Sequence, residues 1–157
     1  MKQGFIFISA VLVLFGCASL SVHSQESCAD EASVQRVEAG IAETQHQAKA
    51  RERVQQAEIK ALLDRETQKK QWSPAQVEQL FANMLKDEQF SQLEAQKKPY
   101  TSDLIRMIRT LRSSKAGARD LAAECQQAQQ ITAILHNIIQ VNQQQYEWMR
   151  RYIEQAP

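Results

Sequence analysis

The sequence predicts an all-α fold, an elongated antiparallel helical bundle of about four helices. Glycine, proline and aromatic residues are scarce, while Gln, Ala, Glu, Lys and Arg are abundant. The abundant residues mostly favour helix, and nowhere do β-formers alternate for long enough to predict a strand. An apolar repeat near the C-terminus indicates close helix packing. We therefore expect two long parallel outer helices and two shorter return helices.

The first long helix is expected from about Asp30 to about Lys70, because no proline interrupts this stretch. Its apolar residues are sparse, and many of them are alanine. This pattern is typical of a helix that covers one side of a bundle and leaves its other face in water.

Two shorter helices are expected to bring the chain back. The segment Ser73–Gln76 reads Ser-Pro-Ala-Gln, which combines a capping serine, a proline at the first helical position and a capping-box glutamine. Apolar residues at helical spacing extend this helix for about 23 residues, until Pro99 ends it. Thr101 or Ser102 then caps a third helix of about 12 residues, with Pro99 as the joint.

The fourth helix, from about Ala118 to about Glu154, carries the clearest pattern in the chain. Two apolar stripes run side by side along it, so we expect this helix to contact two partners and to be the central packing element. The first stripe is a heptad seam formed by Leu121, Cys125, Ala128, Thr132, Leu135, Ile139, Asn142, Tyr146, Met149 and Ile153. The second is formed by Ile131, Ile134, Ile138, Val141, Trp148 and Tyr152.

The N-terminal segment has the pattern of an export signal. Lys2 precedes an apolar run, Gly4–Gly16, which is too short to span a bilayer. The run ends in Leu-Phe-Gly-Cys, which resembles a bacterial lipobox, although Phe15 stands where a small or β-branched residue is usual. The resemblance implies that residues 1–16 are a lipoprotein signal and that Cys17 becomes the lipidated mature N-terminus.

Cleavage at an alternative site would remove Cys17 and give a mature protein without a lipid anchor. Val22 and Ser24 are small residues at the spacing of an ordinary signal-peptidase site, so residues 1–24 are then the signal peptide. Either route leaves residues 25–157 as a single helical domain in the periplasm. If Cys17 is lipidated, Ala18 follows it, and resemblance to enterobacterial lipoproteins then implies an outer-membrane anchor.

The chain has three cysteines. Cys17 is lost to the lipid or to the signal, which leaves Cys28 and Cys125 in an oxidising compartment, where a disulfide is expected. This disulfide would hold together the starts of the first and fourth helices, so those helices should run parallel. Two unrelated thiols, one of them buried, are the alternative.

Composition and motifs indicate no catalytic residues, metal or cofactor. Without Lys2, 18 of the 19 basic residues remain against 18 acidic ones, so electrostatic capture of nucleic acid is not expected. His46 has Glu43 three residues before it, which is half of a di-iron motif, but His136 lacks a carboxylate at that spacing. No glycine-rich phosphate loop is present.

One enzymatic alternative is a secreted all-α enzyme of chorismate-mutase-like architecture. By analogy, such a site needs two arginines, a lysine and a Glu or Gln around a dicarboxylate. These residue types are present, but their spacing does not match that family: Arg51, Arg119, Lys60 and Gln127.

Two groups of residues are candidate contact sites. Arg106, Arg109 and Arg112 fan over about one third of the third helix and are a candidate site for an anion or a partner; the alternative is a solvated helix face. A second group near the C-terminus has the composition of a docking patch, and the alternative there is packing at the end of the bundle: Tyr146, Trp148, Arg150, Arg151 and Tyr152.

These observations together predict an exported bacterial envelope protein that is periplasmic and lipid-anchored. Its expected role is a non-enzymatic protein-interaction module, an adaptor, chaperone or secretion accessory, whose partner is another envelope protein. Contact with the membrane is expected only through the anchor. The alternative is a small helical bundle that binds an anionic ligand.

Overall fold

The computed structural model describes residues 28, 30–114 and 120–157 of the chain. Within these residues the protein is all-α, with four helices and no strand, which confirms the predicted fold class. The helices are α1 (Glu31–Lys70), α2 (Pro74–Met84), α3 (Glu88–Ser114) and α4 (Leu121–Gln155). The predicted signal and the lipidation site Cys17 lie outside the described residues.

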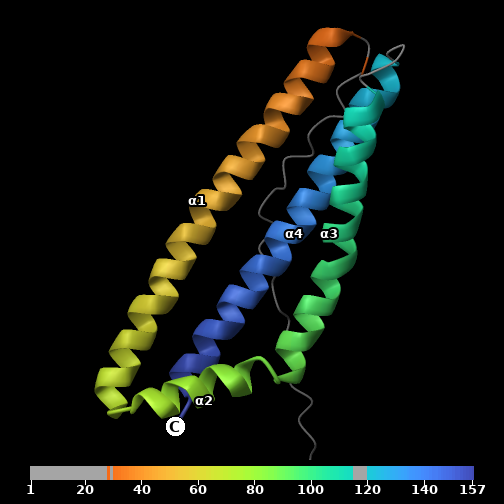
Figure 1. Cartoon of the computed structure of the whole chain (residues 1–157). Coiled ribbons are helices and arrows are strands. Elements are labelled where there is room, and N and C mark those ends of the chain that lie inside the picture. The colour runs from red at the N-terminus through yellow and green to blue at the C-terminus, as the bar shows by residue number, and fades with distance from the viewer. Residues whose placement is uncertain (1–27, 29, 115–119) are drawn as a thin grey trace, which may run out of the picture.

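The four helices form an elongated bundle in which α4 is the central helix (Figure 1). α1 and α4 run in the same direction and α3 runs against them, so the predicted parallel pairing of the two long helices is confirmed. The extensive helix contacts are those of α4 with α1 and of α4 with α3. The prediction that the fourth helix packs against two partners is therefore also confirmed.

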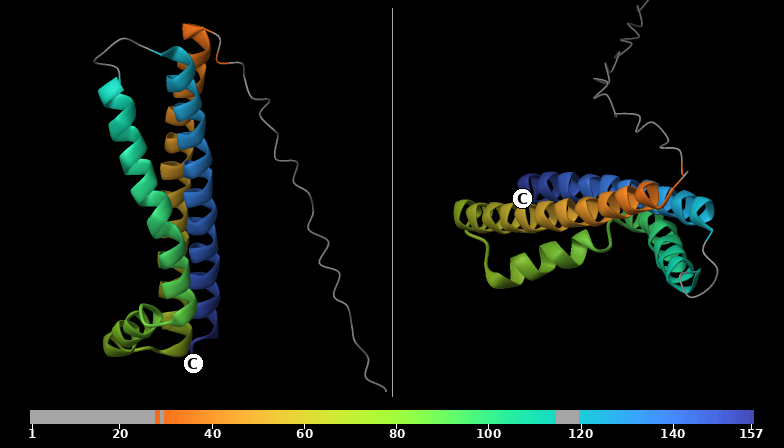
Figure 2. Two further views of the ribbon diagram at one scale, coloured as in Figure 1. Left: turned by 90° about the vertical axis from the view of Figure 1, so that its right-hand side faces the viewer. Right: turned by 90° about the horizontal axis from the view of Figure 1, so that it is seen from above.

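The position of the joint between the second and third helices was predicted wrongly. The chain breaks around Asp87, and Pro99 lies inside α3. The carboxylate of Asp87 accepts hydrogen bonds from the backbone N–H groups of Gln89 (2.8 Å) and Phe90 (3.2 Å), and so caps α3. α2 consequently lies across the end of the bundle, and α3 makes the return by itself (Figure 2).

Pro99 is tolerated inside α3 because it lies on an exposed face. A proline in a helix lacks the N–H that would bond the carbonyl four residues earlier, and it bends the helix. The Thr101 hydroxyl donates to the Lys97 carbonyl at 3.1 Å, within the same turn. Figure 2 shows α3 leaning away from α4 toward its C-terminal end.

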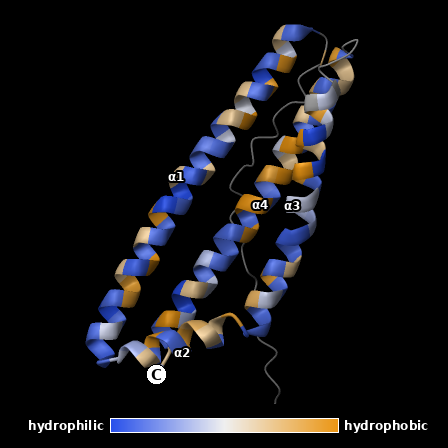
Figure 3. Ribbon diagram, viewed as in Figure 1, coloured by the Kyte–Doolittle hydropathy of each residue, from blue (hydrophilic) through white to orange (hydrophobic). Residues whose placement is uncertain are grey.

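The apolar core is concentrated at the end of the bundle where α2 lies. One buried cluster joins α2, α3 and α4, and the other joins α1, α2 and α4. By contrast, α1 is mostly hydrophilic along its length (Figure 3). The first cluster is Met84, Leu93, Val141 and Trp148, and the second is Leu62, Leu80 and Ile153.

α1 is fixed firmly at its two ends. At its start, Asp30 accepts hydrogen bonds from the Ser33 hydroxyl (2.7 Å) and backbone N–H (2.8 Å), which hold the pKa of Asp30 below its ordinary value. At its other end, Lys70 donates to the Glu154 carbonyl (3.1 Å) and the Trp72 indole donates to the Pro157 carbonyl (2.8 Å). The last residues of the chain are therefore held against the α1–α2 turn.

None of the helices in the described part of the chain combines the length and the apolar character needed to cross a membrane.

Candidate functional site

The two cysteines expected to pair lie together at one end of the bundle. The Sγ atoms of Cys28 and Cys125 are 2.09 Å apart, the distance of a disulfide bond, and the Cα atoms are 5.6 Å apart. Cys125 is fully buried, and Gln129 donates to the Cys28 sulfur at 3.6 Å. The linked ends are the starts of α1 and α4.

The basic group on α3 lies on a helix face rather than in a cavity. Arg106 and Arg109 are both exposed, and Arg106 forms an ion pair with Asp103 at 2.8 Å, three residues away. An exposed pair of this kind is typical of a solvated helix face. Arg112 lies in α3, but its side chain is outside the described part of the structure.

The aromatic residues of the predicted docking patch near the C-terminus are largely packed inside the bundle. Tyr146 is 8% and Trp148 is 5% exposed, and Tyr152 packs beside Trp148 with ring centres 4.8 Å apart. α2 and α3 supply apolar side chains that pack with Trp148 and Tyr152. Arg150 and Arg151 alone of the group are exposed. The aromatic residues therefore serve mainly as packing at the end of the bundle, which was the alternative to a docking patch.

The structure does not assemble the residues considered for catalysis or metal binding. His46 and His136 are both exposed. In the described ranges, no cluster of three or more His, Cys, Asp or Glu side chains is placed to hold a metal ion. Arg51 and Lys60 line the groove described next, whereas Gln127 donates to the Met107 carbonyl at 3.1 Å between α3 and α4. Arg119 lies outside the described residues.

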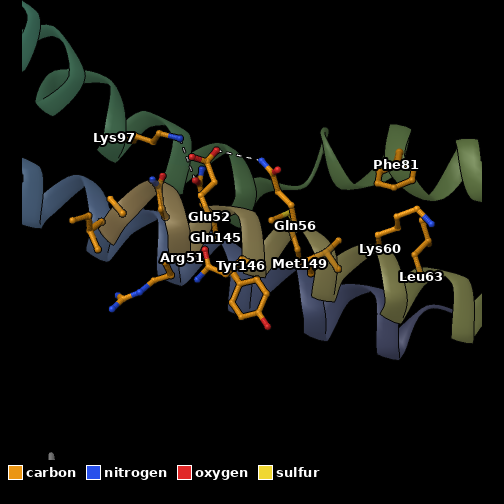
Figure 4. Close-up of a pocket in the computed structure, with 15 residues that line it drawn as sticks. Arg51, Glu52, Gln56, Lys60, Leu63, Phe81, Lys97, Gln145, Tyr146 and Met149 are labelled. Atoms are coloured by element: carbon orange, nitrogen blue, oxygen red, sulfur yellow. Dashed lines mark hydrogen bonds between the residues drawn. The ribbon is translucent and has the colours of Figure 1, made fainter. Parts of the chain in front are cut away.

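A groove of about 460 Å³ lies between α1, α3 and α4, and α2 contributes to one end of it. The groove falls in the size range of small-molecule sites. Its lining side chains come from α1, α2, α3 and α4 and are drawn in Figure 4. They are Ala48, Arg51, Glu52, Gln55, Gln56, Ile59, Lys60, Leu63, Phe81, Lys97, Ile139, Asn142, Gln145, Tyr146 and Met149.

The floor of the groove is apolar, and its polar groups are distributed unevenly along it. Leu63, Phe81 and Met149 lie toward the α2 end (Figure 4). Arg51 and Lys97 lie toward the opposite end, which faces the middle of the bundle. A groove with one apolar end and one cationic end suits an amphiphilic occupant.

A small polar network fixes the wall formed by α3 and α4. Gln145 is 6% exposed, and its amide group bonds to two residues of α3. Its oxygen accepts from the Lys97 ammonium at 3.5 Å, and its nitrogen donates to the Glu94 carboxylate. Because Lys97 also lies 3.9 Å from Glu94, its ammonium is held at the groove.

The charged residues of the groove give it a positive balance. Three cations, Arg51, Lys60 and Lys97, and one carboxylate, Glu52, line it, which leaves a formal charge of 3 − 1 = +2. Lys60 is engaged by Asp64 at 2.8 Å. Glu52 accepts a hydrogen bond from Gln56 at 3.3 Å. Across the described residues, no ion pair is recorded for Arg51, which leaves its guanidinium available to an anion.

The sequence predicted the apolar seam of α4 that forms the floor of this groove, but it did not predict that a groove lies above the seam. Ile139, Asn142, Tyr146 and Met149 were recognised as part of the α4 seam, and the structure shows that α1 and α3 diverge above them. The one sequence signal was Asn142, a polar residue in an otherwise apolar seam. It lies at the groove, half-buried.

Comparison of the chain with protein-family models, with curated proteins and with solved structures gives no match.

Proposed function

We propose that this chain is an exported envelope protein that acts by non-covalent binding in the groove rather than by catalysis. The observation that carries the proposal is the groove, because it is preformed, has an apolar floor and presents an arginine with no partner among the described residues. Such a concave apolar site with a few placed polar groups is the usual form of a binding site.

The envelope location rests on the sequence. The export-type segment before Ser24 directs the chain out of the cytoplasm, and Cys17 is the proposed site of a lipid anchor in the outer membrane. The pairing of Cys28 with Cys125 is consistent with an oxidising compartment such as the periplasm. With the anchor in place, the disulfide end of the bundle is the end nearest the membrane.

An adaptor role through the C-terminal aromatic residues loses its support, because those residues are buried. The large apolar side chains that are exposed in the described part of the chain lie singly, in α1, just after α2 and in α3: Val54, Leu85 and Ile105. Scattered apolar residues of this kind are normal on a soluble surface and do not define a partner site. The groove is therefore the site that we propose for the occupant, whether a segment of another envelope protein or a small ligand.

Site-specific photocrosslinking in intact cells tests this proposal. A benzophenone amino acid replaces Gln56, which is exposed on α1 and lines the groove. The matched control replaces Val54, which is 57% exposed and lies about 200° away around the same helix. We expect an adduct of defined mass from position 56 and none from position 54. Adducts from both positions, or from neither, would refute the proposal.

A further inference from the structure

We infer that the groove binds a single-chain anionic amphiphile, with its acyl chain along the apolar floor and its anionic head at Arg51 and Lys97. The chemical class includes a fatty acid and a lysophospholipid. This inference rests on the proposed function, since it names the occupant of the same groove.

The dimensions of the groove select an extended chain. Its lining on α1 runs from Ala48 to Leu63, which is about 22 Å at 1.5 Å per residue. Its volume of about 460 Å³ is small for a groove of that length. A long groove of small volume suits one extended chain better than a compact ligand.

An extended peptide would fit the width but not the chemistry. Its backbone N–H and C=O groups need hydrogen-bond partners when they are buried. The walls of this groove are helices, whose backbone groups are already paired internally, so they offer no edge to pair with a strand. A methylene chain has no such groups, and its burial against Ile59, Leu63 and Phe81 is favourable.

The charges place the head group. At the α2 end, the ammonium of Lys60 is already paired with Asp64, and the surrounding side chains are mostly apolar. At the other end lie Arg51, for which the described residues provide no ion pair, and Lys97, whose contact with Glu94 is long at 3.9 Å. The Glu52 carboxylate also lies at this end, so the local formal charge of the groove is 2 − 1 = +1, which favours an anionic head group.

The length of the groove sets the length of the chain. An extended acyl chain advances about 1.25 Å per methylene, given carbon–carbon bonds of about 1.5 Å. A path of about 22 Å therefore holds about 14–18 carbons. Affinity should rise up to about fourfold for each added methylene until this length is reached.

Isothermal titration calorimetry with the delipidated chain, below the micelle concentration, tests the inference. The probes are palmitoleate, lysophosphatidylglycerol, octanoate and a neutral C16 monoacylglycerol. We expect saturable 1:1 binding of at least one long anionic probe, with octanoate and the neutral lipid at least tenfold weaker. The relative affinities of palmitoleate and lysophosphatidylglycerol distinguish a free fatty acid from a lipid head group as the source.

Matched variants locate the site. Ala48→Trp fills the groove, whereas Ala57→Trp adds the same side chain about 180° away on α1. Binding should be lost in the first and retained in the second, with both variants keeping the helical circular-dichroism signal. Lys97→Gln should weaken binding by up to about fivefold, and Lys98→Gln, its exposed neighbour outside this groove, should not.

The results separate this inference from the proposed function. If neither long anionic probe binds, or if Ala48→Trp binds as well as the native chain, the amphiphile inference is overturned. A polypeptide adduct from position 56 in that case would leave the groove as a binding site for a different occupant. If Ala48→Trp does not fold, two other comparisons test the inference. Equal binding by Lys97→Gln and Lys98→Gln, or equal binding of the neutral and the anionic lipid, would show that the groove does not recognise an anionic head group.

Discussion

The hydroxyl of Tyr146 on α4 donates a hydrogen bond to the carboxylate of Glu58 on α1. A second polar contact crosses the same interface, where the Gln55 amide donates to the Gln143 oxygen at 2.7 Å. Tyr146 also forms part of the groove wall. These bonds therefore couple the position of α1 to one wall of the proposed site.

Polar contacts are important here because α1 is thinly packed along most of its length. Between Val34 and Leu62 none of its side chains is buried. The disulfide and long-range contacts fix the two ends of α1, and its middle depends on partly buried side chains and on these hydrogen bonds. The side of the groove formed by α1 is thus its most adjustable side.

Removal of the Tyr146 hydroxyl should loosen α1. In Tyr146→Phe the ring remains and the bond to Glu58 is lost, so we expect the free energy of unfolding to fall by about 1 kcal/mol. Tyr152→Phe is the control, because the described structure records no hydrogen bond for that hydroxyl. Urea denaturation at neutral pH measures both, and equal losses in the two variants would contradict the assignment.

The same bond predicts a loss of stability in alkali. Hydrogen bonding to Glu58 and burial both raise the pKa of Tyr146 above its ordinary value. Its contribution is therefore complete below about pH 9, before the unfolded phenol with its pKa of about 10 ionises, and is lost as the pH rises through the folded pKa. Between about pH 9 and about pH 11, the native chain should lose more stability than Tyr146→Phe. These limits lie about one pH unit below and above the reference pKa of tyrosine. Parallel pH profiles would rule this out.

Loss of the cysteine pair should free the first half of α1 before the rest of the bundle. Cys28 and Cys125 are 97 residues apart in the sequence, and closing a loop of that length stabilises by up to about 4–5 kcal/mol in the chain-entropy model. In Cys28→Ala, hydrogen exchange should accelerate in residues 35–55 while the α3–α4 interface stays protected. Uniform acceleration in all helices would show that α1 does not detach separately.

Pro99 should be a net cost to the stability of α3. A proline in a helix interior is about 3 kcal/mol less favourable than alanine, offset in part by its effect on the unfolded chain. Pro99→Ala should therefore raise the free energy of unfolding by about 1–2 kcal/mol. Pro74→Ala is the matched control at the first position of α2, where proline is favourable, so it should give no gain. A destabilised Pro99→Ala would show that the bend in α3 is needed for packing.

The proposed anchor has a direct test in cells. Labelled palmitate should be incorporated into the native chain and not into Cys17→Ser, because only a cysteine can accept the lipid at that position. The variant should also move from the membrane fraction to the soluble envelope fraction. Unlabelled native protein would instead support cleavage after Ser24.

The sequence predicted those parts of the fold that depend on local signals and on long periodic patterns. The bounds of the first and fourth helices, the capping box at Ser73 and the central place of α4 follow from caps, prolines and apolar spacing, and the structure confirms each of them. The predicted joint at Pro99 is wrong because the chain breaks instead at Asp87, which caps α3, and because an exposed proline is tolerated inside that helix.

The candidate sites were predicted less well, because burial and convergence depend on the tertiary arrangement. Trp148 and Tyr152 belong to a group with the composition of a docking patch, and nothing local in the sequence shows that side chains of α2 and α3 pack against them. The groove joins residues as distant as Arg51, Phe81 and Lys97, so its existence depends on the divergence of α1 and α3 above α4. No sequence pattern reports that divergence.

Native mass spectrometry of the full chain, isolated from its envelope without added lipid, tests the central claim most directly. The native protein and Ala57→Trp should each carry one non-covalent ligand, released on gas-phase activation as a single-chain anionic amphiphile. Ala48→Trp should be empty. If all three proteins carry the same ligand, the groove is not the amphiphile site that we infer. The same conclusion follows if the isolated native protein is empty and also binds no amphiphile in titration.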